Sequence, residues 1–192
     1  MFSKALKGPN ITLEQLAPHH LERLTEAASH DDIWTWAKPV NQDLESFITA
    51  YIEAMTKNHQ GGDPFAYVVI DNKTKTILGS TRYYEVAPSD KRLCIGFTWY
   101  QPSVWGSGIN PETKFLLLSQ AFEALQWNRV GFHVDTRNDR SISAMTYLGA
   151  TNEGILRKHK IVQGNYVRDT VMFSITQDDW PMIKATLQKR FE

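Results

Sequence analysis

Apolar and polar residues alternate with two different periods along the chain, and each period predicts one kind of element. Apolar residues recur at helical spacing near residues 18–28, 43–57, 110–127 and 141–148, so we expect amphipathic helices there. Runs of β-branched and aromatic residues, bounded by turn residues, predict strands over residues 11–13, 65–70, 77–86, 93–100, 129–135, 153–161 and 167–176. The Gly-Gly-Asp-Pro segment at 61–64 should break the chain, and residues 163–165 should form a hairpin turn.

The order of these elements favours a mixed α+β fold built on one sheet. The three strands between residues 65 and 100 follow one another with short turns, which is typical of an antiparallel meander. The strand, helix and strand from 93 to 135 imply a parallel pair with a right-handed crossover. We therefore expect a single domain over residues 1–192, with about six to seven strands in one mostly antiparallel sheet and about four flanking helices.

Composition and charge narrow the classes of partner. Of the 192 residues 42% are hydrophobic, enough for a substantial core, and the 21 basic residues balance the 21 acidic ones. Because no net field attracts nucleic acid or an anionic membrane, we expect neither as a partner. The sequence has no recognisable signal peptide and no run of about 18 apolar residues, which favours a cytoplasmic protein. The single cysteine, Cys94, excludes an internal disulfide, and its apolar strand favours a buried, inert thiol.

A glycine-containing turn joins strand 93–100 to helix 110–127 and has the features of a phosphate-binding loop. Gly106 and Gly108 allow the backbone to approach a ligand closely, and the amides at the start of the helix point at negative charge. Asn110 is a suitable N-cap, and Pro111 suits the first helical position. No Lys-Ser/Thr pair follows Gly108, which excludes a P-loop, and Pro111 replaces the third glycine of a dinucleotide fingerprint. A diphosphate held mainly by backbone amides remains.

The sequence around this loop and after it resembles the GNAT acyl-CoA N-acyltransferases, and its Trp-Gly-x-Gly spelling resembles their RimJ/RimL-type branch. The family loop Gln/Arg-x-x-Gly-x-Gly/Ala falls on residues 105–110, with departures at its first and last positions. Further matches are Asn138-Asp139-Arg140-Ser141 and the stretch 148–157. The resemblance implies a sheet splayed between its two central strands, and acetyl-CoA as the acyl donor. The cofactor-binding residues that it implies are Phe97, Thr98, Trp99, Trp105, Gly106, Ser107, Gly108, Ile109, Asn110, Asn138 and Ser141.

Acyl transfer from a thioester to an amine needs a neutral amine, donors for the developing oxyanion and a proton for the departing thiolate. Glu85 is our first candidate for the base that makes the amine neutral. His133 and Asp135, which share one face of their strand, form a second candidate pair. The resemblance implies a strand bulge that turns a backbone amide near residues 97–99 toward the thioester carbonyl. We expect no metal in this chemistry.

The resemblance also implies a tyrosine as the acid, four residues before the glycine that ends the last helix, and Met145 occupies that position. The hydroxyl of Ser141 is therefore the candidate acid. Recognition of the acceptor is expected from the segment between the first two helices and from strand 77–86, because aromatic rings suit a cationic amine. A core role for the tryptophans is the alternative, and Arg157 and Asp169 should form a structural pair. The candidate acceptor-binding residues are Trp34, Trp36, Arg82, Tyr83 and Tyr84.

These residues favour an acetyl-CoA-dependent N-acetyltransferase that transfers directly in a ternary complex. The branch resemblance favours a protein or peptide N-terminal amine as the acceptor. Similar chains acetylate small amines such as polyamines, amino acids or antibiotics, which keeps that alternative open. The absent tyrosine at Met145 keeps open a catalytically silent acyl-CoA-binding or regulatory module. The chain is compatible with a monomer or a homodimer.

Overall fold

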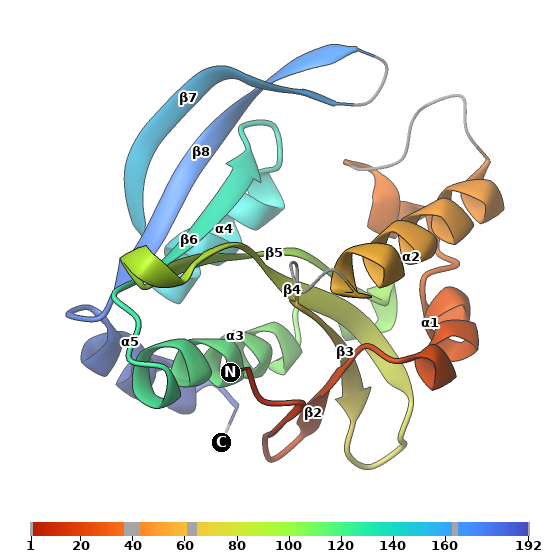
Figure 1. Ribbon diagram of the computed structural model, residues 1–192, viewed down its shortest axis with the longest axis horizontal. Coiled ribbons are helices and arrows are strands. Elements are labelled where there is room, and N and C mark those ends of the chain that lie inside the picture. Colours follow the sequence, from red (N-terminus) through yellow and green to blue (C-terminus); the bar gives the residue numbers. More distant parts are fainter. Residues whose placement is uncertain (1, 37–42, 61–64, 163–164, 192) are drawn as a thin grey trace.

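In the computed structural model, one twisted sheet of eight strands lies between two groups of helices (Figure 1). The structure describes residues 2–36, 43–60, 65–162 and 165–191, so the predicted break at 61–64 and most of the predicted turn at 163–165 lie outside the described residues. The strands are β1 (Ala5–Lys7), β2 (Ile11–Gln15), β3 (Phe65–Asp71), β4 (Ile77–Ala87), β5 (Arg92–Tyr100), β6 (Arg129–Asp135), β7 (Thr151–Val162) and β8 (Tyr166–Thr176). The helices are α1 (Leu21–Ala27), α2 (Leu44–Gln60), α3 (Ile109–Ser119), α4 (Asp139–Leu148) and α5 (Trp180–Gln188).

The predicted fold class is confirmed. The described residues contain one strand and one helix more than the sequence predicted. The additional strand, β1, has three residues and pairs with β2 through Leu6 and Leu13. The additional helix, α5, buries Trp180, Ile183 and Leu187, which share one face because they follow helical spacing. A three-residue strand is too short to give a period, whereas the helical spacing of α5 is readable in the sequence and was missing from the prediction.

Helix α3 differs from its prediction at both ends. It begins at Ile109 with Gly108 as its N-cap, so the predicted N-cap role of Asn110 is wrong. The Asn110 side chain instead accepts a hydrogen bond of 3.2 Å from the Tyr100 hydroxyl. The helix ends at Ser119 and continues as a π-helical turn over Gln120–Ala124, short of the predicted residue 127.

Both faces of the sheet are covered, as the alternation along β3 shows. Tyr67 and Val69 are fully buried in the cluster that contains α3, α4 and α5. Ala66 and Val68 point to the opposite face, where they join the cluster that contains α1 and α2. None of the helices within the described ranges is long and apolar enough to cross a membrane.

The strand order is β1-β2-β3-β4-β5-β6-β8-β7, and β5 and β6 are its one parallel pair. This pair is short, because only Arg92, Leu93 and Cys94 of β5 have partners in β6. Beyond Cys94 the two strands separate, which confirms the splayed sheet that the family resemblance implied. The fork between β5 and β6 is where the candidate site lies.

Candidate active site

A cleft of about 630 Å³ joins the fork between β5 and β6 to the glycine-containing loop. Its walls come from β5, from the loop, from α3, from β6 and from α4, and Arg190 also lines it. Of the predicted cofactor-binding residues, all except Ile109 line this cleft. The Ile109 side chain packs against the core below α3, so only its backbone remains available to a ligand.

The loop between β5 and α3 is built to expose backbone at the start of the helix. Gly106 has a φ of +74°, and a Cβ added there would meet nothing within 4 Å. The Ser107 hydroxyl donates a hydrogen bond of 2.6 Å to the Val104 carbonyl, which closes the turn. The first helical hydrogen bond of α3 runs from the Glu112 amide to the Gly108 carbonyl. Before it, Pro111 has no N–H and the Ile109 amide donates a hydrogen bond of 3.3 Å to the Ser107 hydroxyl, which leaves the Asn110 amide at the positive end of the helix, where an anion is favoured.

Two arginines that were not predicted from the sequence flank this loop. The Arg140 guanidinium lies 4.1 Å from the centroid of the Trp105 ring, and the Arg190 guanidinium lies 3.5 Å from that of Tyr147. Both arginines line the cleft. The loop itself contains no lysine or arginine, and the cleft is cationic because Arg140 of α4 and Arg190 after α5 line it.

Asn138 and Ser141 occupy the N-terminus of α4, on the opposite wall of the cleft. The Asn138 side chain accepts a hydrogen bond of 3.0 Å from the Ser141 amide and caps the helix. Met145 lies one turn after Ser141 on the same face, is 7% exposed and also lines the cleft. Ser141 is therefore the hydroxyl of α4 closest along this face to the position where the resemblance implied a tyrosine.

A bulge in β5 lies at the level of the fork. Phe97 has a φ of +50°, and the pairing with β4 shifts register between Ser80 and Arg82. The predicted bulge near residues 97–99 is thus present, and it frees a backbone amide that an intact ladder would use. Trp99 follows the bulge and packs with its ring 5.4 Å from that of Trp34.

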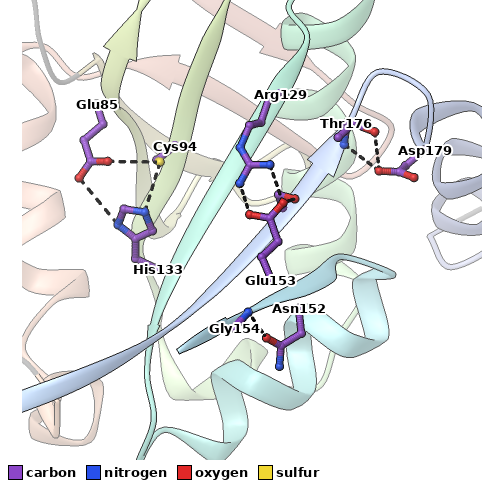
Figure 2. A network of polar contacts seen from close by, with 10 residues as sticks. Glu85, Cys94, Arg129, His133, Asn152, Glu153, Gly154, Thr176 and Asp179 are labelled. Carbon is purple, nitrogen blue, oxygen red and sulfur yellow. Dashed lines mark hydrogen bonds and ion pairs between the residues drawn. The ribbon is translucent and has the colours of Figure 1, made fainter. Parts of the chain in front are cut away.

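A polar cluster formed by Glu85, Cys94 and His133 lies where β5 and β6 separate (Figure 2). The Glu85 Oε1 is 3.7 Å from the His133 Nδ1, and the Cys94 Sγ is 3.7 Å from the His133 Nε2. Burial lowers the pKa of His133 below its usual value, so its ring is neutral at neutral pH. Burial and the Glu85 carboxylate raise the pKa of the Cys94 thiol to about 12. Cys94 is buried, as predicted, in polar rather than apolar surroundings.

The fold pairs the candidate bases differently from the prediction, because His133 lies beside Glu85 and not beside Asp135. His133 lines the cleft and contacts Glu85, which does not line the cleft itself. Asp135 instead forms an ion pair of 2.8 Å with Arg137, so it does not pair with His133. Asp169 is also otherwise engaged, because its carboxylate accepts a hydrogen bond of 2.6 Å from the Lys158 amide rather than pairing with Arg157.

Lys114 is a further site residue that was not predicted from the sequence. Its side chain extends from α3 into the cleft floor, where it is 3% exposed and donates a hydrogen bond of 3.0 Å to the Thr98 hydroxyl. Burial lowers the pKa of this ammonium from 10.5 to about 7. A lysine that changes charge near neutral pH beside the β5 bulge is suited to proton transfer.

The candidate acceptor residues lie at different depths. Trp34 and Trp36 both line the cleft, and Trp34 is buried with its indole N–H on the Ala28 carbonyl at 2.8 Å. Trp34 therefore has the core role that was the alternative, and it also forms part of the cleft wall. Trp36 is 36% exposed at the cleft opening.

The three candidates on β4 do not line the cleft. Tyr83 is fully buried on the opposite face, with its hydroxyl on the Leu117 carbonyl at 2.7 Å, so its predicted role in acceptor binding is wrong. Strand alternation explains this, since Arg82 and Tyr84 face the other way. The Arg82 guanidinium lies 3.3 Å from the centroid of the Phe97 ring, and the Tyr84 ring packs edge-on against those of Phe97 and His133. Arg82 and Tyr84 thus pack against the side chains of Phe97 and His133 instead of lining the cleft.

Comparison with known proteins agrees with this geometry. Residues 10–151 match the family model described as the acetyltransferase (GNAT) domain. The chain is 23% identical over 172 residues to the uncharacterized N-acetyltransferase YoaA of Bacillus subtilis, covering 90% of this chain and 96% of YoaA.

Solved structures share the whole fold. A T. thermophilus protein assigned as an acetyltransferase superposes with a TM-score of 0.88 at 30% identity, covering 100% of this chain and 99% of that one. Mycobacterium smegmatis RimJ in complex with CoA-disulfide superposes with a TM-score of 0.79 at 18% identity, covering 96% of this chain and 92% of RimJ. The family match covers well over half of the chain, and the protein therefore belongs to the GNAT family of acetyltransferases.

Proposed function

We propose that this protein, acting as one acetyltransferase domain over residues 1–192, transfers an acetyl group from acetyl-CoA to the N-terminal amine of a peptide or protein. The observation that carries the proposal is the continuous cleft, which connects the phosphate-binding loop to the neutral His133 at the fork. A donor held along this cleft has its diphosphate at one end and its reacting thioester at the other.

The lining residues fit coenzyme A. Gly106 leaves open space over the loop, the helix start supplies an amide, and Arg140 and Arg190 supply positive charge for phosphate groups. Farther along, the bulge leaves Phe97 and Thr98 without partners in the pairing with β4, so it can supply a backbone amide at the fork. Such an amide stabilises the oxyanion that develops on the thioester carbonyl when the amine attacks.

His133 acts as the base in this proposal, and Glu85 assists it. The neutral imidazole takes a proton from the acceptor ammonium, and the nearby Glu85 carboxylate stabilises the imidazolium that results. The side chain of Glu85 is 45% exposed, so the proton can pass from this pair to solvent. Once the first proton has passed to solvent, the free amine attacks the thioester carbon and the new C–N bond forms. The nitrogen then gives its second proton to the neutral His133 as the C–S bond breaks.

The departing thiolate needs a proton, and of the groups that line the cleft we propose Ser141 and Lys114 as its source. Ser141 has the position on α4 that the family resemblance favours, and the Lys114 ammonium lies on the cleft floor with a pKa of about 7. Lys114 is the stronger acid of the two, because a hydroxyl holds its proton far more tightly than an ammonium with this pKa. Replacement of each in turn separates their roles.

The charge of the cleft bears on the acceptor. Within the part of the chain that the structure describes, no Asp or Glu lines the cleft, whereas Lys114, Arg140 and Arg190 do. A polyamine carries several positive charges and would be repelled by such walls, whereas an N-terminal amine brings a single charge that His133 removes. The aromatic Trp36 at the opening suits that single cation.

The proposal is tested by thiol release from acetyl-CoA with matched acceptors. A panel of peptides with a free N-terminus should react, whereas the same peptides blocked at the α-amine, with a lysine ε-amine left free, should not. His133→Asn should lower kcat by about 100-fold, within the range that general base catalysis contributes, and leave acetyl-CoA binding unchanged. His30→Asn, at an exposed residue outside the cleft, is the matched control.

Other outcomes identify the alternatives. Turnover with polyamines, amino acids or aminoglycosides, and not with peptides, would transfer the function to small-molecule amines. Binding of acetyl-CoA without turnover over the whole panel would indicate a regulatory module, and failure to bind acetyl-CoA at millimolar concentration would refute the proposal.

A further inference from the structure

The cluster of Glu85, Cys94 and His133 combines three different metal-binding atoms in one place. A carboxylate oxygen, a thiol sulfur and an imidazole nitrogen lie within 4.8 Å of one another (Figure 2). The Cys94 Sγ is 3.6 Å from the Glu85 Oε2 and 3.7 Å from the His133 Nε2. The three side chains come from β4, β5 and β6, so the sheet itself fixes their arrangement.

The contact between His133 and Glu85 is too long for a direct hydrogen bond. The 3.7 Å between the His133 Nδ1 and the Glu85 Oε1 exceeds the range of about 2.7–3.2 Å for an N–H···O bond, and this buried nitrogen has no hydrogen-bond partner among the described residues. With about 2.3 Å to sulfur and about 2.0–2.2 Å to nitrogen or oxygen, a tetrahedral Zn²⁺ site has ligand–ligand distances of about 3.3–3.6 Å. The distances from Glu85 and from Cys94 end on different nitrogens of the His133 ring, and with one ligand atom from each residue the separations are within 4.8 Å. The widest separation must therefore contract by up to about 1.5 Å, which rotation of the half-exposed Glu85 side chain can supply.

The backbone around the cluster makes room for these side chains. Gly131 lies opposite Cys94 in the parallel pair, and a Cβ there would be 2.9 Å from the Cys94 Sγ. Glu85 lies at a bulge with a φ of +50°, which turns its side chain toward the fork. The Cys94 and His133 side chains are 5% and 9% exposed, whereas Glu85 is 45% exposed and gives an ion access from solvent.

We propose that Glu85, Cys94 and His133 form a binding site for Zn²⁺ or a similar borderline-soft divalent cation, with water as the fourth ligand. Binding replaces the Cys94 S–H bond with a metal–thiolate bond, and the proton leaves to solvent. One ring nitrogen of His133 coordinates the ion, and the half-exposed Glu85 carboxylate moves to complete the set. The mixture of sulfur, nitrogen and oxygen ligands favours Zn²⁺ over Mg²⁺ or Ca²⁺.

Occupation of this site has a consequence that rests on the proposed function. A metal-bound His133 nitrogen cannot accept a proton, and Glu85 is withdrawn from the same task. The cation therefore inhibits acetyl transfer reversibly without touching the phosphate-binding loop. The binding site itself stands or falls separately from the activity.

Titration of the full chain with Co²⁺ tests the site by a spectroscopic readout that needs no turnover. Wild type should show a thiolate-to-Co²⁺ charge-transfer band, with the d–d absorption of a four-coordinate ion, and Zn²⁺ should displace Co²⁺. Cys94→Ser should abolish the charge-transfer band. Glu85→Gln, at a half-exposed side chain, should weaken Co²⁺ binding by at least about tenfold with the chain still folded.

A second cluster supplies the matched control. Glu14 lies with His19 and His20 in a similar three-ligand group near α1, outside the cleft. Glu14→Gln should leave the charge-transfer band and the affinity unchanged. A wild-type chain that binds neither ion, or a Cys94→Ser variant that keeps the wild-type spectrum, overturns the site.

The activity arm separates the two proposals. Zn²⁺ should inhibit wild type at concentrations that match its binding, and the chelator EDTA should restore the rate. Metal binding without any acetyltransferase activity supports the site and counts against the proposed function. Full activity of a Zn²⁺-loaded enzyme overturns the inhibition and leaves both the binding site and the acetyl transfer standing.

Discussion

Lys114 is a buried lysine, and its lowered pKa gives the amount by which it reduces the free energy of unfolding. Its ammonium donates to the Thr98 hydroxyl, and burial lowers its pKa from 10.5 to about 7. In the unfolded chain the side chain keeps its ordinary pKa, so unfolding takes up a proton between those two pH values. At about 1.36 kcal/mol for each tenfold change in proton affinity, the folded state loses about 4 kcal/mol of stability near pH 7.

Replacement of Lys114 by Met keeps an unbranched side chain of similar length and removes the charge. We expect the free energy of unfolding to rise near neutral pH, with about 4 kcal/mol as the upper bound because the cleft admits water to the ammonium. In the wild type, the loss of folding free energy caused by Lys114 disappears as pH rises through the lysine pKa of the unfolded chain, because the side chain is then neutral in both states. The advantage of the variant should therefore fall by up to about 3 kcal/mol between about pH 7 and about pH 9.5.

Urea unfolding of both chains at these two pH values measures the difference, and titration of other groups cancels because the chains share them. Lys184→Met, which removes a partly exposed ion pair of 2.7 Å with Glu123, is the matched control. It should lower stability by at most about 1 kcal/mol. A Lys114→Met variant that is less stable than wild type at both pH values, with the same pH dependence, would refute the reasoning. The same variant should retain acetyl-CoA binding and lose turnover if Lys114 protonates the thiolate.

Three further predictions concern the cleft. Gly106→Ala imposes a left-handed φ on alanine at a cost of about 1–2 kcal/mol and should weaken acetyl-CoA binding in calorimetric titration. Gly154→Ala, with a φ of +125° in the hairpin, should cost stability alone, and equal binding by the two variants would contradict the loop assignment. Because the pKa of His133 is lowered and its neutral form is the base in the proposed mechanism, kcat/KM should fall on the acid side below about pH 6.5, and His133→Asn should remove that acid limb. An acid limb that persists would exclude His133 as the base. Asn138→Ala should cost about 1 kcal/mol by removing the cap of α4, whereas Asn138→Asp should keep the cap and weaken acetyl-CoA binding by charge repulsion. Acetyl-CoA binding by Asn138→Asp equal to that of wild type would show that this side chain only caps the helix.

The glycine loop and most elements were predictable because they depend on local sequence. Gly106 signals a turn that needs a positive φ, and the periods of apolar residues indicate the helices and strands. The position of Tyr83 also follows from local sequence, because alternation along β4 places its side chain on the face opposite Arg82 and Tyr84. The three residues therefore cannot all contact one acceptor. Local patterns thus determined what each element is and which way its side chains point.

Residues that meet only through the tertiary fold could not be found in the same way. Arg190 lies far along the chain from the loop that it flanks, and nothing in its neighbourhood distinguishes it from a solvated arginine. A lysine within a helix is normally expected at the surface, and only the tertiary fold buries Lys114 in the floor of the cleft. The contact between Glu85 and His133 depends on the strand order and on a bulge, neither of which a single sequence specifies.

Two of the bulges in this sheet flank the fork, and both hold ordinary residues in left-handed backbone. Glu85 on β4 and Phe97 on β5 each have a φ of +50°, a conformation that glycine adopts at lower cost. A glycine at 97 would lose the ring over which Arg82 packs, and a glycine at 85 would lose the carboxylate beside His133. The pairing of β4 with β5 shifts register on either side of Tyr84, and these shifts accommodate the left-handed backbone of the two residues. The strain is thus located where a side chain and a free amide are both needed, which links the irregular pairing of β4 and β5 to the chemistry at the fork.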